Sequence, residues 1–509
     1  MFEYYIAGAG LRLSQVIIYS SLWIVSGCLI AAVFRCMVGA EKTRRIFANG
    51  SRWGVAAGWL IGMLLPVCSL GVIPIVRELH RAGVKRGTIV AFGLTAPLFN
   101  PMSVLYGLTL SDPIAILSFS LCALVIVSVL GFFWDRFSPV SEEDIPVDEK
   151  LPVPGIKRTL AVIYSASREL VGPTMVYILI GIAGSVMMAV VLPKGCLQSQ
   201  VERDNILAPI IMAVMATPIY STPLLAMSQI GGMFQHGNSI GAAFTLLILG
   251  AGANIGLLCW FARTYGVRKV FVFCMLLVTI TVALAYAIDK PLYPKGIEPA
   301  GHSHAFDVYT HPFFTQSQDL VEVAIRKGKD FYVANEVGAT FILVGMILLG
   351  SLLTLVGRKV DFESWFTQGV PSESRYDIIV PSWILGIVSV GALVAASIVG
   401  CYLYYPAPDD LLADFFSVHA ETVLTSKTQE WEAAEKWIAY SDDLSRRLEV
   451  GVFLRQGGID EFMSTKAKVY REKLDALRES VESKNVETVG PNAMAVQEAY
   501  RRMSAAFRE

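Results

Sequence analysis

Charged residues are scarce in this sequence. Lys, Arg, Asp and Glu together make up 17% of its 509 residues, against about a quarter in a typical soluble domain. Hydrophobic residues make up 54%, and the mean hydropathy is +0.54. The net charge is −1, so the composition offers no basic surface of the kind that binds nucleic acid. These values argue against an ordinary soluble domain and indicate a membrane protein.

Catalytic and cofactor-binding motifs are also missing. The eight cysteines form no Cys-x-x-Cys pair, which argues against a disulfide framework, a zinc ribbon or attached haem. No P-loop, dinucleotide fingerprint or nucleophile–base pair is present, so neither an ATP-driven pump nor an enzyme is indicated, and no cofactor is required. The cores of the apolar runs contain no ionisable residue, which weakens a proton relay through side chains at the middle of the membrane.

Long apolar runs dominate the rest of the chain. Each is about 20 residues long, enough for a helix to cross a bilayer. The ten runs cover residues 13–34, 53–76, 87–110, 113–134, 172–193, 206–230, 239–262, 268–288, 337–356 and 380–404. The sequence therefore predicts an all-α, polytopic protein with about ten transmembrane helices, whose first partner is the lipid bilayer.

The first eight runs divide into two halves, residues 1–134 and 171–288, with four runs in each. Glycine and asparagine spacing favours two repeats of one unit, because Gly83, Gly87 and Asn100 are spaced like Gly237, Gly241 and Asn254. With four spans in each half, the repeats are expected to be parallel. Residues 135–170 form a polar linker between them.

Three further segments follow the second half. Residues 289–336 are predicted to be a long extramembrane loop, and residues 337–404 an extra two-span hairpin. From residue 405 to 509, apolar residues recur at helical spacing in a more polar chain, which predicts a soluble helical bundle.

Prolines and glycines interrupt some of the apolar runs. The predicted backbone breaks lie at Pro66, Gly71, Pro74, Pro97, Pro101, Pro218 and Pro223. In a membrane such breaks are tolerated only where they are buried in protein or line a cavity, and in transporters they tend to mark the substrate site. We therefore expect residues 66–74 to face residues 217–223 across a polar site.

Uncharged polar residues near the breaks are the candidates for a substrate path. They are Cys68, Ser69, Thr95, Asn100, Thr217, Tyr220, Ser221 and Asn254. The alternative for Asn100 and Asn254 is that they only brace the breaks or the packing between the halves. The alternative for Cys68 is a small buried apolar residue.

The motifs from Cys68 to Pro74 and from Thr95 to Pro101 resemble the signature of the predicted permease family that includes organoarsenical-efflux permeases. The resemblance covers roughly residues 10–288. It implies a membrane permease that exports a small solute, a metal or metalloid, or an organic derivative, through a site between the two repeats. Members of that family typically carry a second cysteine where this chain has Leu70, so the resemblance does not extend to a thiol pair.

A histidine-containing motif lies in the long loop after the second half. Its candidate metal ligands are His302, His304, Asp307 and His311. Imidazole and carboxylate groups in this number are sufficient for Zn or Cu. The alternative is a surface cluster of histidines without metal.

Basic residues give conflicting indications of orientation. A cytoplasmic first loop is favoured by Arg35, Lys42, Arg44, Arg45 and Arg52. Arg77, Arg81, Lys85 and Arg86 indicate the opposite for the loop between the second and third runs. The protein is expected in a bacterial inner membrane. If the first group decides its orientation, the His loop and the C-terminal domain lie on the outer face.

Two classes of function remain open. The first is a permease for a small molecule or ion. The second is a non-transporting membrane anchor or assembly subunit that binds a partner protein through its C-terminal helical domain, which a minimal carrier would not need.

Overall fold

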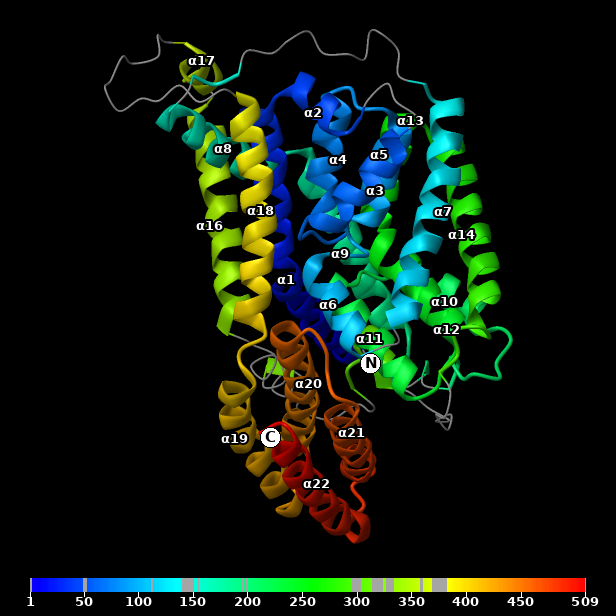
Figure 1. The fold of residues 1–509 in the computed structure, drawn as a ribbon. Coiled ribbons are helices and arrows are strands. Elements are labelled where there is room, and N and C mark those ends of the chain that lie inside the picture. Colours follow the sequence, from blue (N-terminus) through cyan, green and yellow to red (C-terminus); the bar gives the residue numbers. More distant parts are fainter. Residues whose placement is uncertain are drawn as a thin grey trace. The chain divides into compact units, whose positions relative to one another are not determined.

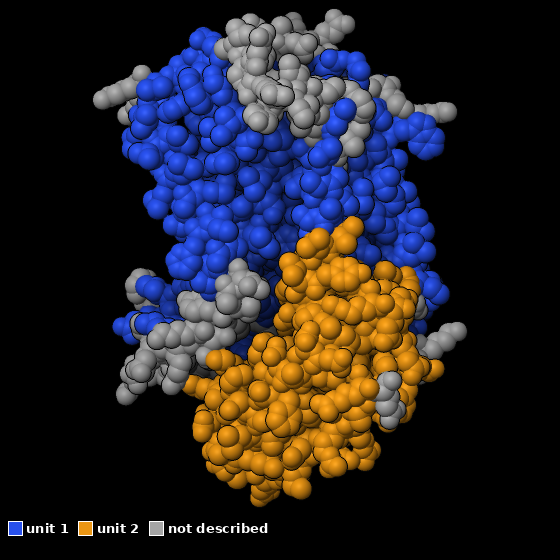
Figure 2. Space-filling view, turned by 60° about the vertical axis from the view of Figure 1, so that its left-hand side comes forward, with its two compact units in different colours: residues 1–104, 114–397 blue, residues 105–113, 398–509 orange. Residues whose placement is uncertain are grey.

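The protein is all-helical in the parts that its computed structural model describes. These are residues 2–48, 53–110, 113–139, 151–153, 155–194, 196–197, 199–294, 304–313, 324–325, 334–357, 360–368 and 382–508, and they contain no strand. The chain forms two compact units (Figure 2). Unit 1 comprises residues 1–104 and 114–397, and unit 2 comprises residues 105–113 and 398–509.

Five helices in the described residues are long and apolar enough to cross a membrane. They are α1 (Phe2–Val33), α7 (Pro113–Phe137), α9 (Pro173–Val191), α14 (Val267–Asp289) and α16 (Ala334–Val356). A bent pair of helices, with 58° between residues 240–252 and 255–265, makes a sixth. The all-α polytopic class is confirmed, whereas the expected count of ten spans is not.

The outer surface of α7 shows why these helices suit a bilayer. Its exposed apolar side chains recur every three or four residues along one face: Ile114, Leu117, Leu121, Val125, Val129 and Phe132. A continuous apolar stripe of this kind is unfavourable in water and favourable against lipid chains. The opposite face of α7 is buried in unit 1.

The apolar run of residues 53–76 folds as two short helices that run in opposite directions. These are α3 (Gly54–Leu64) and α4 (Val72–Arg81), and α5 (Arg86–Thr95) follows (Figure 1). Gly54 of α3 lies against Thr88, and Gly62 of α3 lies against Thr95 and Ala96, so α3 runs parallel to α5. The tight turn at Gly83, with φ of +76°, reverses the chain between α4 and α5. The pair α3–α4 therefore enters the unit and returns to the side from which it came.

The run of residues 206–230 has the same arrangement. It forms α10 (Ala208–Ala216) and α11 (Pro223–Gln235), followed by α12 (Ile240–Thr245), the π-helix η3 (Leu246–Gly252) and α13 (Ile255–Tyr265). Gly241 lies against Pro209 and Gly250 against Ala216, so α10 runs parallel to α12–η3. Gly237, with φ of +62°, turns the chain after α11.

Two broken passages complete the halves of unit 1. In the first half α5 is followed after five residues by α6 (Pro101–Leu110), and in the second half η3 is followed after two residues by α13. Each half thus contains two long helices, a re-entrant pair and a broken helix, where four spans with breaks were expected from the sequence.

Shorter helices cover one end of unit 1. The π-helix η1 (Phe34–Val38) and α2 (Ala40–Ile46) follow α1, and the amphipathic helix α8 (Ile156–Glu169) precedes α9. Helix α17 (Phe362–Thr367) lies against this region, because the amide of Val153 donates to the carbonyl of Phe366. At the other end of α1, the 3₁₀-helix η4 (His304–Tyr309) packs on α9 and α11. Helix α18 (Ser382–Tyr404) leads from unit 1 into unit 2.

Unit 2 contains a four-helix bundle with its own core. Its helices are α19 (Pro408–Lys427), α20 (Trp431–Gln456), α21 (Glu461–Glu482) and α22 (Val486–Ala506). Phe415, Tyr470 and Tyr500 are among the residues that fill the core. A buried ion pair joins Arg471 to Glu449 at 2.5 Å. The soluble helical domain expected from residue 405 onwards stays a prediction.

Candidate functional site

Four helix breaks lie inside unit 1, at residues 65–71, 96–100, 217–222 and 253–254. The first and third connect the arms of the two re-entrant pairs, and the second and fourth interrupt the two broken helices. In each break the backbone leaves the helical path among buried side chains. This is the situation that a membrane protein tolerates only within its own packed interior.

The first and third breaks meet side chain to side chain. The thiol of Cys68 interacts with the hydroxyl of Tyr220, although the contact does not satisfy the geometry of a normal hydrogen bond. The amide of Tyr220 donates a 2.7 Å hydrogen bond to Ser185 Oγ of α9. Residues 65–71 and 217–222 therefore face each other, as expected from the sequence.

The fourth break packs against α9, the helix that the first and third breaks also contact. A Cβ added at Gly181 would lie 2.4 Å from Asn254 Oδ1 and 2.6 Å from a Leu70 methyl group, so both side chains already occupy that space. One turn further, Gly184 lies against the Pro218 carbonyl and the side chain of Ile255. The small residues of α9 thus allow three breaks to approach one surface.

The second break contacts the fourth. Gly252, just before the fourth break, lies against Leu98 of the second. The amide of Ser221 in turn donates to the carbonyl of Gly250, at 3.3 Å. All four breaks are consequently neighbours in one region of unit 1.

Helix α1 seals one side of this region by backbone contact. A Cβ at Gly27 would lie 1.9 Å from the carbonyl oxygen of Gly71, and a Cβ at Gly71 would lie 2.2 Å from that of Trp23. Only glycine at both positions permits the first break to approach α1 so closely.

Asn100 and Asn254 occupy equivalent places in the two broken helices. Asn100 Oδ1 accepts a 2.8 Å hydrogen bond from the amide of Ser103 at the start of α6. Asn254 Oδ1 accepts a 2.7 Å hydrogen bond from the amide of Gly256 at the start of α13. Both asparagines thus cap a helix N-terminus, as the bracing alternative expected.

Unpaired polar groups are concentrated at the breaks. Buried side-chain atoms without a hydrogen-bond partner include Ser69 Oγ, Thr95 Oγ1, Asn100 Nδ2, Tyr220 Oη and Asn254 Nδ2. All five residues were candidates from the sequence. A buried polar group without a partner is unfavourable by roughly 1–3 kcal/mol, so a ligand or water that bonded to these groups would stabilise the breaks.

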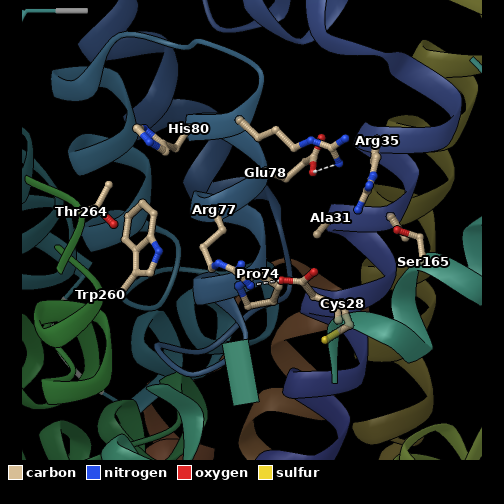
Figure 3. A pocket seen from close by; sticks show the side chains of 13 residues that line it. Cys28, Ala31, Arg35, Pro74, Arg77, Glu78, His80, Ser165, Trp260 and Thr264 are labelled. Atoms are coloured by element: carbon tan, nitrogen blue, oxygen red, sulfur yellow. Dashed lines mark hydrogen bonds and ion pairs between the residues drawn. The ribbon is translucent and has the colours of Figure 1, made fainter. Parts of the chain in front are cut away.

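A cavity of about 320 Å³ opens near the C-terminal end of α1 (Figure 3). Its lining includes Cys28 and Arg35 of α1, Pro74 and Arg77 of α4, and Glu169 of α8. Arg77 and Glu169 form an ion pair across it. The base of this cavity at Cys28 and Pro74 adjoins the first break.

Further charged and aromatic side chains surround this cavity. Arg81 lies 3.9 Å from Glu78 on the same turn of α4. His80 Nδ1 lies 3.3 Å from the Tyr265 hydroxyl, and its ring packs edge-on against Trp260. Arg35 and Glu169 lie outside every sequence motif and were missed by sequence reasoning, whereas Glu78 and His80 adjoin the first break in the chain.

A smaller cavity, about 30 Å³, lies nearer the N-terminal end of α1. Its lining includes Arg12 and Tyr19 of α1, Ser185 of α9, Tyr220 of the third break, and Tyr309. Tyr19 lines the smaller cavity and Cys28 lines the larger one. Among the α1 residues that line the two cavities, these two are closest together in the sequence. Nine residues separate them, which corresponds to about 14 Å of helix. The breaks and the seal at Gly27 lie between the two cavities.

The segment 304–313 forms one wall of the smaller cavity. Arg12 donates from Nε and Nη2 to the carbonyl of Thr310, at 3.1 and 2.8 Å. The Tyr309 hydroxyl donates to Gln229 Oε1 of α11 at 2.9 Å. These contacts fix the segment to α1 and α11, a role that its sequence did not indicate.

Of the four candidate metal ligands, only the His311 side chain belongs to the described residues. His302 and the side chains of His304 and Asp307 lie outside them. The His311 ring is buried and stacks on Tyr4, with 3.7 Å between ring centroids. Among the described residues no group of three or more His, Cys, Asp or Glu side chains is arranged to hold a metal.

The remaining candidates are distributed around the breaks. Ser221 is buried and its hydroxyl donates to the carbonyl of Thr222, and Thr217 donates to Ala213 at the end of α10. Pro97 lies in the second break, while Pro74, Pro101 and Pro223 lie in the first turns of α4, α6 and α11. Ser185 joined the site without any signal in the sequence, because it comes from the middle of a continuous helix.

A polytopic membrane protein with broken helices between two cavities has the architecture of a carrier. The chain belongs to the family described as "predicted permease", whose model matches residues 11–290. It is also 35% identical, over 88 residues, to the UPF0718 protein YcgR of Bacillus subtilis (strain 168). That match covers 17% of this chain and 30% of YcgR. No solved structure matches the chain.

Proposed function

We propose that this protein is a permease that carries a small solute past the four helix breaks by opening the two cavities in turn. The observation that carries the proposal is the convergence of the breaks between a cavity of about 320 Å³ and one of about 30 Å³. Membership of a permease family supports a transporter. In this view the described conformation is open toward the larger cavity and closed at Gly27 and Gly71.

The two halves of unit 1 are proposed to be inverted repeats. A third cavity, of about 580 Å³, supports this arrangement, because Arg35 and Cys36 at the C-terminal end of α1 line it together with Pro173 at the start of α9. Helices α1 and α9 are therefore antiparallel, and the re-entrant pairs that follow them enter from opposite faces. Three crossings in each half relate the halves by an axis in the membrane plane. The parallel repeats expected from the sequence would need an even number of crossings, such as four, in each half.

The larger cavity is proposed to face the cytoplasm. Because α3–α4 returns to its own side, Arg77 and Arg81 lie on the same face as Arg35, and the conflict between the basic loops disappears. Lys269 and Arg86 also share this face, since both donate to Ser138 Oγ. A face this rich in Lys and Arg is typically cytoplasmic in a bacterial inner membrane.

The C-terminal bundle is proposed to lie on the outer side. Helix α17 lies against the linker on the proposed cytoplasmic face, through Val153 and through Lys157, which donates to the Trp365 carbonyl. Helix α18 follows α17 and has 23 residues, enough to cross a bilayer once. Its end at Tyr404 would then emerge on the opposite face, where the bundle begins.

Export is the proposed direction. The larger cavity is on the proposed cytoplasmic face and holds an open volume next to the breaks, which suits loading from inside the cell. The resemblance to organoarsenical-efflux permeases points the same way. Leu70 in place of a second cysteine argues against a thiol pair as the means of binding.

Cysteine accessibility tests the two-cavity mechanism. In a cysteine-free full-length protein, Ser165→Cys places a thiol in the larger cavity and Val16→Cys places one in the smaller. A membrane-impermeant maleimide should label the first from the cytoplasmic side and the second from the outer side. Val129→Cys on the lipid-facing stripe is the control and should react from neither side. Labelling of both cavity cysteines from one side would refute the mechanism.

A further inference from the structure

We infer that the transported solute is a small oxyanion, held during passage by the side-chain amide nitrogens of Asn100 and Asn254. The inference rests on the permease proposal and names the chemical class of its substrate. Two observations support it: the chemistry of the unpaired groups and the charge of the larger cavity.

Four helices begin where the breaks end. Helix α4 begins at Val72, α6 at Pro101, α11 at Pro223 and α13 at Ile255. In their first turns the amides of Val72, Ser103, Leu225 and Gly256 already have acceptors. Helices α3, α5, α10 and η3 end at the same four breaks, so the helix dipoles oppose one another there and the side chains decide which ligand is favoured.

The unpaired side-chain groups add hydrogen-bond donors. Asn100 and Asn254 are completely buried, and each uses its Oδ1 to cap a helix. This use fixes the orientation of the side-chain amide, because a flipped amide would place a donor against the backbone N–H. Each Nδ2 is therefore a donor at a helix N-terminus, and neither has a partner. An amide nitrogen cannot accept a hydrogen bond or coordinate a cation.

The hydroxyls nearby are compatible with the same ligand. Ser69, Thr95 and Tyr220 are buried, and their oxygens have no hydrogen-bond partner. A hydroxyl rotates to donate to an anion as readily as it accepts from another ligand. None of the residues in the four breaks is charged, so no carboxylate opposes an anion there.

The larger cavity carries a matching charge. Three arginines line it, Arg35, Arg77 and Arg81, against two glutamates, Glu78 and Glu169. This leaves one excess positive charge, before any protonation of His80. In Figure 3 the Arg35 side chain extends toward the cavity from α1. A cavity lined with this charge raises the local concentration of anions at the entrance to the path.

Asparagine-to-aspartate variants test the inference while the helix caps are kept. Asp caps a helix as well as Asn does, but it replaces the donating Nδ2 by an oxygen that repels an anion. The variants are Asn100→Asp and Asn254→Asp in the full-length protein. Asn485→Asp is the control for the exchange at an exposed cap, because Asn485 Oδ1 caps α22 in unit 2 and accepts from the amide of Glu487 at 3.0 Å.

Uptake into proteoliposomes is the measurement, with phosphate, sulfate and methylphosphonate as probes and with choline and mannitol for comparison. The wild-type protein should carry at least one oxyanion in preference to choline and mannitol. Asn100→Asp and Asn254→Asp should each reduce that uptake at least tenfold, and Asn485→Asp should leave it unchanged. Arg35→Gln should raise the half-saturating oxyanion concentration several-fold, with little effect on the maximal rate.

Two results would overturn the inference. One is preferential uptake of choline or mannitol by the wild-type protein. The other is wild-type oxyanion uptake by Asn100→Asp and Asn254→Asp, with chromatographic elution showing that both are folded. Either result leaves the permease proposal intact, because that proposal falls only if the cavity cysteines react from the same side.

Discussion

The backbone amide of Gly87 donates a 2.7 Å hydrogen bond to the carboxylate of Asp135, at the far end of the next long helix. The same contact recurs in the second half, where Gly241 donates to Asp289 at 2.7 Å. Both pairs are separated by 48 residues. Each carboxylate satisfies an amide in the first turn of α5 or α12, which has no partner within its own helix. The repeated contact ties the start of each broken passage to the end of α7 or α14.

Removing either carboxylate should destabilise unit 1. Asp135→Ala and Asp289→Ala leave an N-terminal amide without its charged acceptor, at a cost of about 1–3 kcal/mol. Asn variants should lose less, because an amide oxygen can still accept. Thermal unfolding in detergent measures the effect, with exposed Asp414→Ala in unit 2 as the control. Unchanged midpoints in both Ala variants would show that the contact does not hold α5 and α12 in place.

Glycine 27 should be essential for the seal between the cavities. Gly27→Ala places a methyl group within 1.9 Å of the Gly71 carbonyl oxygen, so α1 or the first break must shift. Overpacking of this kind costs about 1–3 kcal/mol, and transport should fall because the seal no longer closes correctly. Gly10→Ala is the matched control on the same helix, since nothing lies within 4 Å of its added Cβ. Equal activity of the two variants in vesicle transport would argue against the seal.

Cysteine 68 should be replaceable by serine. Cys68 Sγ accepts a 3.3 Å hydrogen bond from the amide of Gly71, and a serine oxygen can accept the same bond. Leu70 removes the second thiol of the family motif, so a soft metal gains only one ligand here. We expect Cys68→Ser to retain most transport activity in export assays with arsenicals and in the oxyanion uptake assay. Complete loss of export in a folded Cys68→Ser protein would show that a single thiol is sufficient for binding.

The C-terminal bundle should loosen in acid because of His419. Its ring is stacked on Tyr500, with 4.0 Å between centroids, and its Nδ1 lies 3.4 Å from the Tyr470 hydroxyl. Burial lowers the pKa of His419 to about 4, below about 6.5 in an unfolded chain. The unfolded state therefore binds a proton between these values and the folded state does not. The stability contributed by neutral His419 is complete above pH 6.5 and decreases as the pH falls toward 4, by up to about 3 kcal/mol.

Hydrogen exchange in the full-length protein can follow this effect locally. Peptides from α19 and α22 should exchange faster at pH 5 than at pH 7, after correction for the intrinsic rates. His419→Phe keeps the ring stacking and removes the titration, so its exchange should depend much less on pH. An unchanged pH dependence in that variant would assign the acid response to other groups of the bundle, such as Glu449 in its buried pair with Arg471.

Local chemistry allowed much of the candidate site to be predicted. Proline and glycine cannot continue a helix without loss of a hydrogen bond or of conformational stability, so Pro66, Gly71 and Pro218 identified the breaks directly. Asn100 and Asn254 stood out because a buried amide in an apolar run needs a partner. The membrane class followed from the apolar runs and the low fraction of charge. None of these inferences depended on how the helices pack.

Tertiary structure decided the direction of the chain. An apolar run with a central break has the same hydropathy whether it crosses the membrane or returns, so residues 53–76 could not be distinguished from a span. The close approach of Gly54 and Gly62 to α5 makes α3 parallel to α5, and α4 then has to run back. That reversal brings Arg77 and Arg81 to the face of Arg35. Contacts between residues far apart in the chain also placed Ser185, Glu169 and Tyr309 around the cavities. No local pattern could reveal these residues, because their roles arise only from what packs against them.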